Sequence, residues 1–268
     1  MTTDHLCLVY EGESQLRTAA ARFLSEGLGR GEQVGYYAWG GREELRRGLH
    51  KLGDVDELGR RGALLVIPLD EDYRRDQVPD PDSRLAFWSD ATDRARAAGF
   101  RALRVVTDTT PWLDLPQQRG VFLRSERLLD QYAHDHPLAV MCVCDGTILK
   151  PDAVAEITSI HAVTPGASPP FRLHATTGAD FALEGEIDPF TAPLLERVLA
   201  AVGDTRTDRE LTIDVRGLDF VEHRSLLTLE HHATRHDVPA VVLCGASATV
   251  RELVELLGLQ RIRVEESR

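Results

Sequence analysis

HLCLVYE, residues 5–11, is an apolar run of strand length that ends at a Gly turn. Amphipathic helical patterns over residues 15–28 and 82–98 lie between this run and others like it. The other runs, bounded by Gly, Pro or Asp, are QVGYYAW (33–39), ALLVIPL (63–69), ALRVVTD (102–108) and LAVMCVCD (138–145). Alternation of strands and helices predicts right-handed crossovers and a mostly parallel sheet with helices on both faces. The first part of the chain is therefore expected to have an α/β fold.

The composition is typical of a globular chain that binds neither nucleic acid nor membrane. Its 268 residues suffice for two domains of ordinary size. A formal net charge of −12, with no cationic cluster, argues against binding to a phosphate backbone. No apolar run approaches the roughly 20 residues of a membrane helix, and the polar start is no signal peptide. We expect a cytoplasmic protein with no nucleic-acid or membrane partner, and the sequence leaves homodimerisation open.

The four cysteines are Cys7, Cys142, Cys144 and Cys244. They lack paired CxxC spacing and fall in apolar runs of strand length. This distribution favours reduced thiols over a disulfide framework.

The stretch VTPGASPPF, residues 163–171, is the clearest domain boundary, because three prolines and a glycine do not continue a helix. We predict a first domain over 1–163, a linker over 164–170 and a second domain over 171–268. In the second, FRLHA and FALEGEID form a strand pair. The later elements are a helix at 191–202, strand LTIDV, a helix at 224–235, strand PAVVLCG and a helix at 247–257. This order predicts a small α/β domain.

Three blocks of the second domain resemble the conserved blocks of the STAS domain, the fold of bacterial anti-sigma factor antagonists. They are LEGEIDPFTAPLLERVL (183–199), LTIDVRGLDFVEHRSLLTL (211–229) and VVLCGASATVRELVELLGLQRI (241–262). The resemblance covers residues 171–268 and implies a small mixed sheet packed against helices. It also implies docking on an anti-sigma factor or related signalling protein rather than catalysis.

The turn before the helix at 224–235 departs from the STAS pattern. Phospho-regulated members carry Asp-Ser-Ser-Gly there, whereas this chain has Glu222, His223, Arg224 and Ser225. By the resemblance, these four residues are the candidates for partner docking. Either the domain docks constitutively, or Ser225 has become the phosphate acceptor. A Ser early in a helix is more commonly a cap or a surface residue.

The first 163 residues resemble the MEDS domain, a bacterial sensory module. The matching positions are His5-Leu6-Cys7-Leu8-Val9-Tyr10, Phe23-Leu24, Gly27-Leu28, Gly31-Glu32, Val106-Thr107-Asp108, Trp112, Glu126, Met141-Cys142-Val143-Cys144-Asp145 and His161. The resemblance implies a RecA-like fold. It also implies a small-molecule ligand such as a hydrocarbon derivative, with a metal or haem as one route to binding it. The cofactor is left undetermined.

A nucleotide site is not expected at the first turn. A phosphate loop needs several backbone N–H groups around a Gly-rich turn, a Lys and a Ser or Thr for magnesium. Residues 10–15 offer only Gly12 and carry the carboxylates of Glu11 and Glu13, which would repel a triphosphate. No nucleophile, base and acid stand at recognisable spacing elsewhere. We therefore expect no enzyme activity.

Ligands of open α/β sheets bind outside the carboxyl ends of the strands. The candidates nearest that edge are Tyr10, Glu11, Asp108, Thr109 and Cys144. Asp108 offers a polar anchor and Trp112 an aromatic wall, although a helix cap and a covered aromatic ring are equally good interpretations. Glu126 joins the ligand-binding candidates through the MEDS resemblance.

His5 and Cys7 lie at i and i+2 of one strand, so both side chains point into the same helix-covered layer. Three interpretations stay open for them: a hydrogen-bonded core His beside a buried thiol, direct ligand contact, or a metal or haem site. Farther along, His232 and His236 share a helical face, but no third ligand is in view. No metal site is predicted from spacing alone.

The sequence thus predicts a bacterial signalling regulator in which a small-molecule sensor domain is coupled to a STAS docking domain. One alternative is a residual ATPase or small-molecule-processing enzyme acting in the N-terminal crevice. Another is a purely structural docking protein with no ligand.

Overall fold

The computed structural model describes residues 5–202 and 209–265, and the chain forms two compact units. The first runs through Val154 and also takes Val163–Ala167. The second comprises Ala155–Ala162 and the chain from Ser168 onward.

The first unit is built on a sheet in which every strand pair is parallel. Its strands are β1 (His5–Tyr10), β2 (Gln33–Ala38), β3 (Leu64–Pro68), β4 (Leu103–Asp108) and β5 (Leu138–Asp145). Their order across the sheet is β1-β5-β4-β2-β3, so β1 lies at an edge beside β5. All five predicted strands and the α/β fold class are confirmed.

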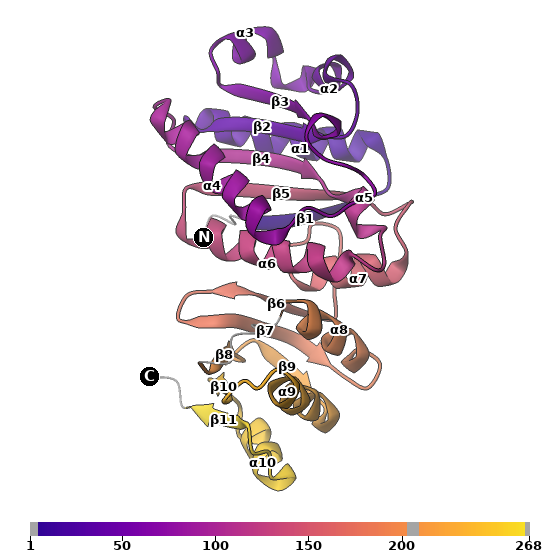
Figure 1. Cartoon of the computed structure of the whole chain (residues 1–268), viewed down its shortest axis with the longest axis vertical. Coiled ribbons are helices and arrows are strands. Elements are labelled where there is room, and N and C mark those ends of the chain that lie inside the picture. Colours follow the sequence, from indigo (N-terminus) through magenta and orange to yellow (C-terminus); the bar gives the residue numbers. More distant parts are fainter. Residues whose placement is uncertain (1–4, 203–208, 266–268) are drawn as a thin grey trace. The chain divides into compact units, whose positions relative to one another are not determined.

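Helices cover both faces of this sheet (Figure 1). The helical segments before the second sheet are α1 (Glu13–Gly29), α2 (Arg42–Gly48), η1 (His50–Leu52), α3 (Val55–Arg60), η2 (Leu69–Glu71), α4 (Pro81–Ala97), α5 (Thr110–Leu113), α6 (Arg119–Asp135) and α7 (Pro151–Ser159). α1 packs on one face, and α4 and α6 pack together on the other. Successive strand residues therefore face different layers: Leu6 and Leu8 lie toward α1, whereas His5 and Cys7 lie toward α6.

Local sequence explains where the two longest predicted helices begin. At the start of α4, the Asp80 carboxylate accepts a hydrogen bond from the Ser83 N–H, and Pro81 occupies the first turn. Both are common features of helix starts. At the start of α1, Gly12 has extended backbone and its carbonyl accepts from the Leu16 N–H.

The chain after α7 returns to the edge of the first sheet. Val163 forms an isolated parallel bridge with Leu6, and the Cys7 N–H donates to the Val163 carbonyl at 3.0 Å. Ala167 N–H then donates to the Thr164 carbonyl, which closes a turn. The bridge attaches Val163 to β1.

The second unit has a mixed sheet, in which β6 and β7 are antiparallel and the other pairs are parallel. Its strands are β6 (Phe171–Thr176), β7 (Ala179–Ile187), β8 (Leu211–Asp214), β9 (Leu218–Val221), β10 (Val241–Cys244) and β11 (Ile262–Glu265). The order is β11-β10-β8-β7-β6, with β9 paired to β7. This mixed α/β domain confirms the predicted fold class of the second part.

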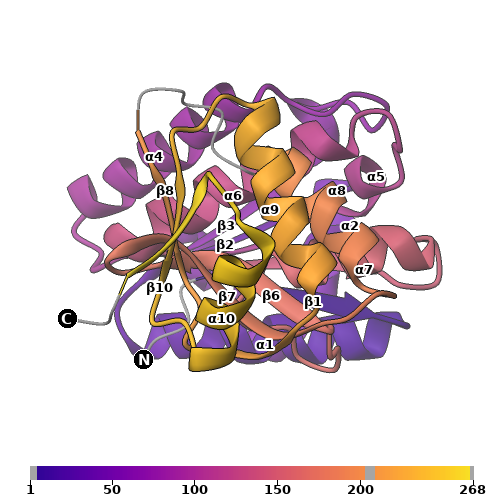
Figure 2. The same cartoon turned by 90° about the horizontal axis from the view of Figure 1, so that it is seen from below.

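In the described part of the second unit, the helices beside this sheet are α8 (Ala192–Val202), α9 (His223–Arg235) and α10 (Ala248–Leu257). α8 and α9 pack against each other, and α10 contacts α9 (Figure 2). Among the described residues, no helix combines the length and the apolar character needed to cross a bilayer.

Candidate metal centre

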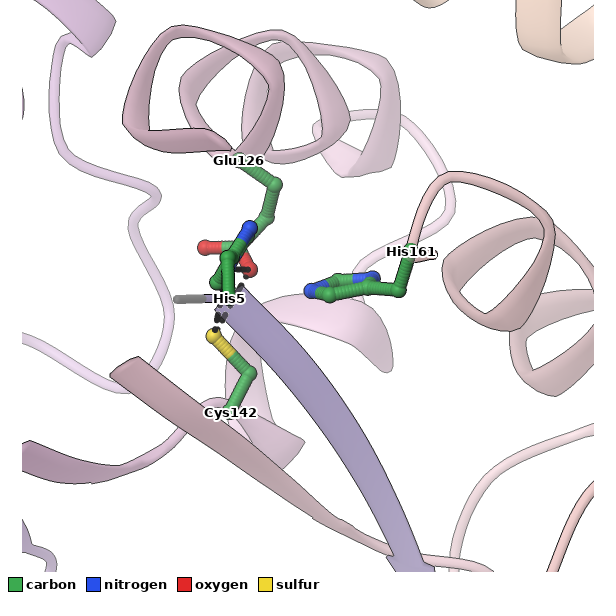
Figure 3. Close-up of side chains that lie close together, drawn as sticks. All are labelled: His5, Glu126, Cys142 and His161. Carbon is green, nitrogen blue, oxygen red and sulfur yellow. Dashed lines mark hydrogen bonds and ion pairs between the residues drawn. The ribbon is translucent and has the colours of Figure 1, made fainter. Parts of the chain in front are cut away.

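Four metal-ligating side chains converge beneath α6: His5 of β1, Glu126 of α6, Cys142 of β5 and His161, which follows α7 (Figure 3). One donor atom from each lies within 4.8 Å of the others, and all four residues are buried. This is the only group of three or more such donors among the residues that the structure describes.

The register of β1 and β5 explains how two of these residues meet. Cys142 pairs with Cys7, which lies two residues after His5 in β1. The side chains of His5, Cys7 and Cys142 therefore lie on the same face of the sheet. His5 Nε2 lies 3.3 Å from Cys142 Sγ and 3.5 Å from Glu126 Oε2. The Cys142 thiol donates to Glu126 Oε2 at 2.8 Å. His161 reaches the group because Val163 is held on β1.

Each of the two histidine rings is also held by a residue outside the group of four. Asp130, one helical turn after Glu126, lies 3.1 Å from His5 Nδ1. His161 Nδ1 lies 2.8 Å from the Ile157 carbonyl. A carbonyl only accepts, so Nδ1 carries the hydrogen, and in the neutral ring Nε2 is the nitrogen with the lone pair that can ligate a metal. Metal-binding histidines are commonly oriented in this way by a carboxylate or a carbonyl.

Arg84 of α4 holds Glu126 from the other side. Its Nη1 donates to Glu126 Oε1 and, at 2.9 Å, to Ser125 Oγ. Both side chains of the Arg84–Glu126 ion pair are almost completely buried, with 3% and 0% exposed. The pair compensates the cost of placing a carboxylate in the core.

The burial and charge of the cluster shift two of its pKa values. Burial and the neighbouring Glu126 raise the pKa of the Cys142 thiol to about 12, with His5 acting in the opposite direction. Burial works to lower the pKa of His5, but Cys142, Asp130 and Glu126 outweigh it and hold that pKa above its ordinary value. A metal ion bound here would therefore compete with protons for these two ligands.

The donor set of two imidazoles, one thiol and one carboxylate is chemically suited to a divalent first-row metal. Zinc takes Cys, His and carboxylate ligands in tetrahedral sites, and imidazole also suits iron, copper and nickel. Haem iron fits less well, because the porphyrin supplies four donors and leaves only two positions for protein ligands. The four converging protein donors therefore suit a single metal ion better than a haem.

Residues 4–162 match the family described as MEDS, the MEthanogen/methylotroph, DcmR Sensory domain. The chain belongs to the MEDS family. The match spans all four residues of the cluster, so the candidate metal centre lies within the MEDS domain. The comparison with curated proteins finds none that matches the chain.

The structure separates the other cysteines of the MEDS domain from this centre. Cys7 and Cys144 are buried and outside the four-donor group. A hydrogen bond between their thiols, together with burial, raises the pKa of Cys7. Of the predicted ligand-binding residues, His5 and Glu126 thus meet at the centre, whereas Cys7 and Cys144 pair beside it.

At the carboxyl ends of the strands, the side chains predicted to bind a ligand instead form hydrogen bonds within the protein. Asp108 Oδ1 accepts hydrogen bonds from the Thr110 N–H and hydroxyl at 3.0 and 2.7 Å. The Thr109 hydroxyl donates to the Val143 carbonyl at 3.2 Å. Trp112 is buried, and its Nε1 donates to the Arg74 carbonyl at 3.1 Å. Each of these three side chains therefore already has a structural role.

Tyr10 and Glu11, also predicted near that edge, differ in exposure. Tyr10 is buried, and burial with Asp108 and Asp145 nearby raises its pKa. Glu11 is exposed. Neither side chain reaches the metal centre.

The sequence analysis did not place four residues at the candidate metal centre: the donors Cys142 and His161, and the supporting residues Asp130 and Arg84. Cys142 and His161 carried the family resemblance but were not placed at the site. One signal could have found Asp130: it lies four residues after Glu126, on a helix whose apolar face also contains Phe122 and Leu129. Two acidic side chains on the buried face of a helix indicate nearby cations or a metal ion, because an unpaired buried charge is costly.

In the second unit, the turn before α9 divides into exposed and buried residues. The side chains of His223 and Arg224 are 50% and 72% exposed, and that of Glu222 is 15% exposed. Ser225 is fully buried, and its hydroxyl has no hydrogen-bond partner among the described residues. Neither a docking partner nor a kinase can reach the Ser225 hydroxyl unless the start of α9 opens.

Proposed function

We propose that this chain is a signalling sensor whose MEDS domain binds one divalent transition-metal ion, zinc being the best fit, through His5, Glu126, Cys142 and His161. We further propose that the C-terminal unit is a STAS-type module that docks on an anti-sigma factor or a related signalling protein. A small-molecule signal read by the first domain changes the docking of the second through residues 164–170. No catalytic activity is assigned to the chain.

The observation that carries the metal assignment is the support behind the donors. Buried polar groups need partners in any case, but here the carboxylate behind His5, the carbonyl behind His161 and the guanidinium behind Glu126 accompany four donor atoms that lie within 4.8 Å of one another. These outer contacts orient the donor atoms toward one point. Such support is characteristic of metal ligands and is important for their affinity.

Cobalt substitution tests this assignment directly. Purified protein treated with a chelator and titrated with Co²⁺ should bind one equivalent and develop a thiolate-to-cobalt charge-transfer band with tetrahedral d–d bands. Zinc should then abolish both signals. A titration that shows no saturable cobalt signal and no zinc competition contradicts the proposed centre.

Asp130→Asn is expected to weaken zinc binding by about 10- to 100-fold without preventing it, because the amide orients His5 but does not increase its basicity. The measurement is zinc affinity by competition with a chromophoric chelator. Asp135→Asn is the matched control, since Asp135 lies exposed at the end of the same helix. Equal affinities for the two variants would remove Asp130 from the site.

Exposed aromatic side chains near the turn before α9 support the docking assignment. Phe190 is 90% exposed and Phe220 is 52% exposed. The two residues approach the same strand end, because Phe220 pairs with Glu186 and the Glu222 N–H donates to the Ile187 carbonyl. Exposed apolar groups rimmed by charged residues are typical of protein interfaces.

Phe190→Ser together with Phe220→Ser is expected to weaken the affinity for a cognate anti-sigma factor at least about tenfold, since buried aromatic anchors dominate interface energies. Calorimetric titration of the purified full chain with purified candidate anti-sigma factors measures this effect. Leu256→Ser, at an 82% exposed residue of α10, is the control for losing an exposed apolar side chain. If every candidate fails to bind, or if Leu256→Ser has the larger effect, the proposed docking surface is contradicted.

A further inference from the structure

An open groove of about 780 Å³ lies on the face of the first sheet opposite the metal centre. Its floor is formed by Leu6 and Leu8 of β1, Met141 of β5 and Phe23 of α1. The volume is within the usual range of small-molecule sites, and an apolar floor is also usual there. The groove belongs to the first unit alone.

One side of α1 forms a polar rim above this floor. Ser14, Thr18, Arg22 and Glu26 follow one another at four-residue spacing and all line the groove. Residues at this spacing share one side of a helix. The groove therefore has an apolar interior and a polar edge, which suits an amphiphilic ligand.

The charges at this edge favour an anion. Glu26 is already paired with Arg30 at 2.5 Å. Within the described part of the chain, Arg22 forms no ion pair with a carboxylate. The Lys51 ammonium donates to the Thr18 hydroxyl at 3.0 Å, which brings a second cation to the rim. Lys51 is one of only two lysines in a chain with a net charge of −12.

The groove is also connected to the two features used in the proposed function. Leu6 and Met141 are the chain neighbours of His5 and Cys142, so two of the four floor residues are covalently next to a metal-site residue. Pro165 and Gly166, which follow the Val163 bridge, form part of the groove wall. These two residues lie in the segment 164–170 to which we assign signal transfer.

We propose that this groove binds a free anionic amphiphile, such as a medium-chain carboxylate, with the chain on Leu6, Leu8, Phe23 and Met141 and the anionic group at Arg22 and Lys51. The proposal specifies the class of ligand that the proposed sensor detects. It rests on the proposed sensory function, but it does not depend on metal binding. Occupancy of the groove orders Pro165 and Gly166.

The test uses the full chain and sodium dodecanoate below its micellar concentration. Calorimetry should show saturable binding of one molecule per chain, and amide exchange over residues 163–167 should slow. Ala19→Trp, which places a bulky ring in the groove, should abolish binding. Ser25→Trp, at an exposed position of the same helix outside the groove lining, should leave it unchanged.

Charge reversal provides a second arm that does not depend on groove filling. Arg22→Glu with Lys51→Glu should weaken dodecanoate binding at least about tenfold at low salt and leave dodecanol binding within about twofold. Arg47→Glu, an exposed cation outside the groove lining, is the matched control.

Three results would overturn the proposal. They are absence of dodecanoate binding, binding only to vesicles of phosphatidylcholine and phosphatidylglycerol, and a dimer that Ala19→Trp converts to a monomer. The last result would mean that a second copy covers the groove. Metal content of each variant separates this test from the proposed function, because groove variants should retain zinc and metal-site variants should retain dodecanoate binding.

Discussion

Replacing Cys142 with serine is expected to abolish tight metal binding while the chain stays folded. A serine hydroxyl is protonated at neutral pH and is a poor ligand for zinc, whereas the cysteine supplies a thiolate once its proton is released. The serine hydroxyl can still donate to Glu126 as the thiol does, so the buried carboxylate retains a donor. The charge-transfer band of the cobalt-loaded protein should disappear, and zinc affinity should fall at least about 100-fold.

Cys7→Ser is the matched control for that experiment. Cys7 is buried on the same face and pairs with Cys142 in the sheet register, but it lies outside the group of four donors. Its substitution should leave the cobalt spectrum and the stoichiometry intact. A Cys142→Ser variant that keeps the wild-type cobalt spectrum, or a Cys7→Ser variant that loses it, would show that the thiolate ligand is assigned wrongly.

Arg84→Leu is expected to lower the free energy of unfolding of the metal-free protein by about 3–5 kcal/mol, since it removes the buried guanidinium that compensates the Glu126 charge. The loss of packing adds to this effect, because the guanidinium lies 4.9 Å from the Phe122 ring centre and 5.6 Å from that of Trp112. Urea unfolding of the chelator-treated protein measures the change.

Zinc should reduce the cost of Arg84→Leu, because the ion compensates the Glu126 charge and binding to the folded state stabilises it. Arg94→Leu, at an exposed position of the same helix, should change the free energy of unfolding by less than about 0.5 kcal/mol. Equal destabilisation by Arg84→Leu with and without zinc would indicate that the ion pair stabilises the fold independently of any metal.

Much of the fold could be predicted because it depends on local patterns. Continuous apolar runs bounded by turn residues identified the five buried strands, and apolar periodicity identified α1 and α4. The pattern failed for β9 and β11, whose four-residue strands are largely exposed and carry no apolar run. Their positions are determined by pairing with β7 and β10, which sequence periodicity does not reveal.

The candidate site was only partly predictable because its contacts are long-range. His5 and Cys142 are 137 residues apart, and nothing local indicates that β5 lies beside β1. The rule that ligands bind at the carboxyl ends of strands directed attention to Asp108 and Trp112. The cluster instead lies on the face of the sheet beneath α6, where the buried acid Glu126 was the most informative residue.

The metal content of the freshly purified chain, measured by inductively coupled plasma mass spectrometry against protein concentration, tests the central claim most directly. The chain should carry about one divalent first-row metal ion per molecule, held by the His5, Glu126, Cys142 and His161 donors. The Cys142→Ser variant prepared in parallel should carry less than about a tenth of that amount. Equal metal content in the two proteins, or a wild-type chain that remains metal-free after incubation with zinc, would contradict a metal centre in this MEDS domain.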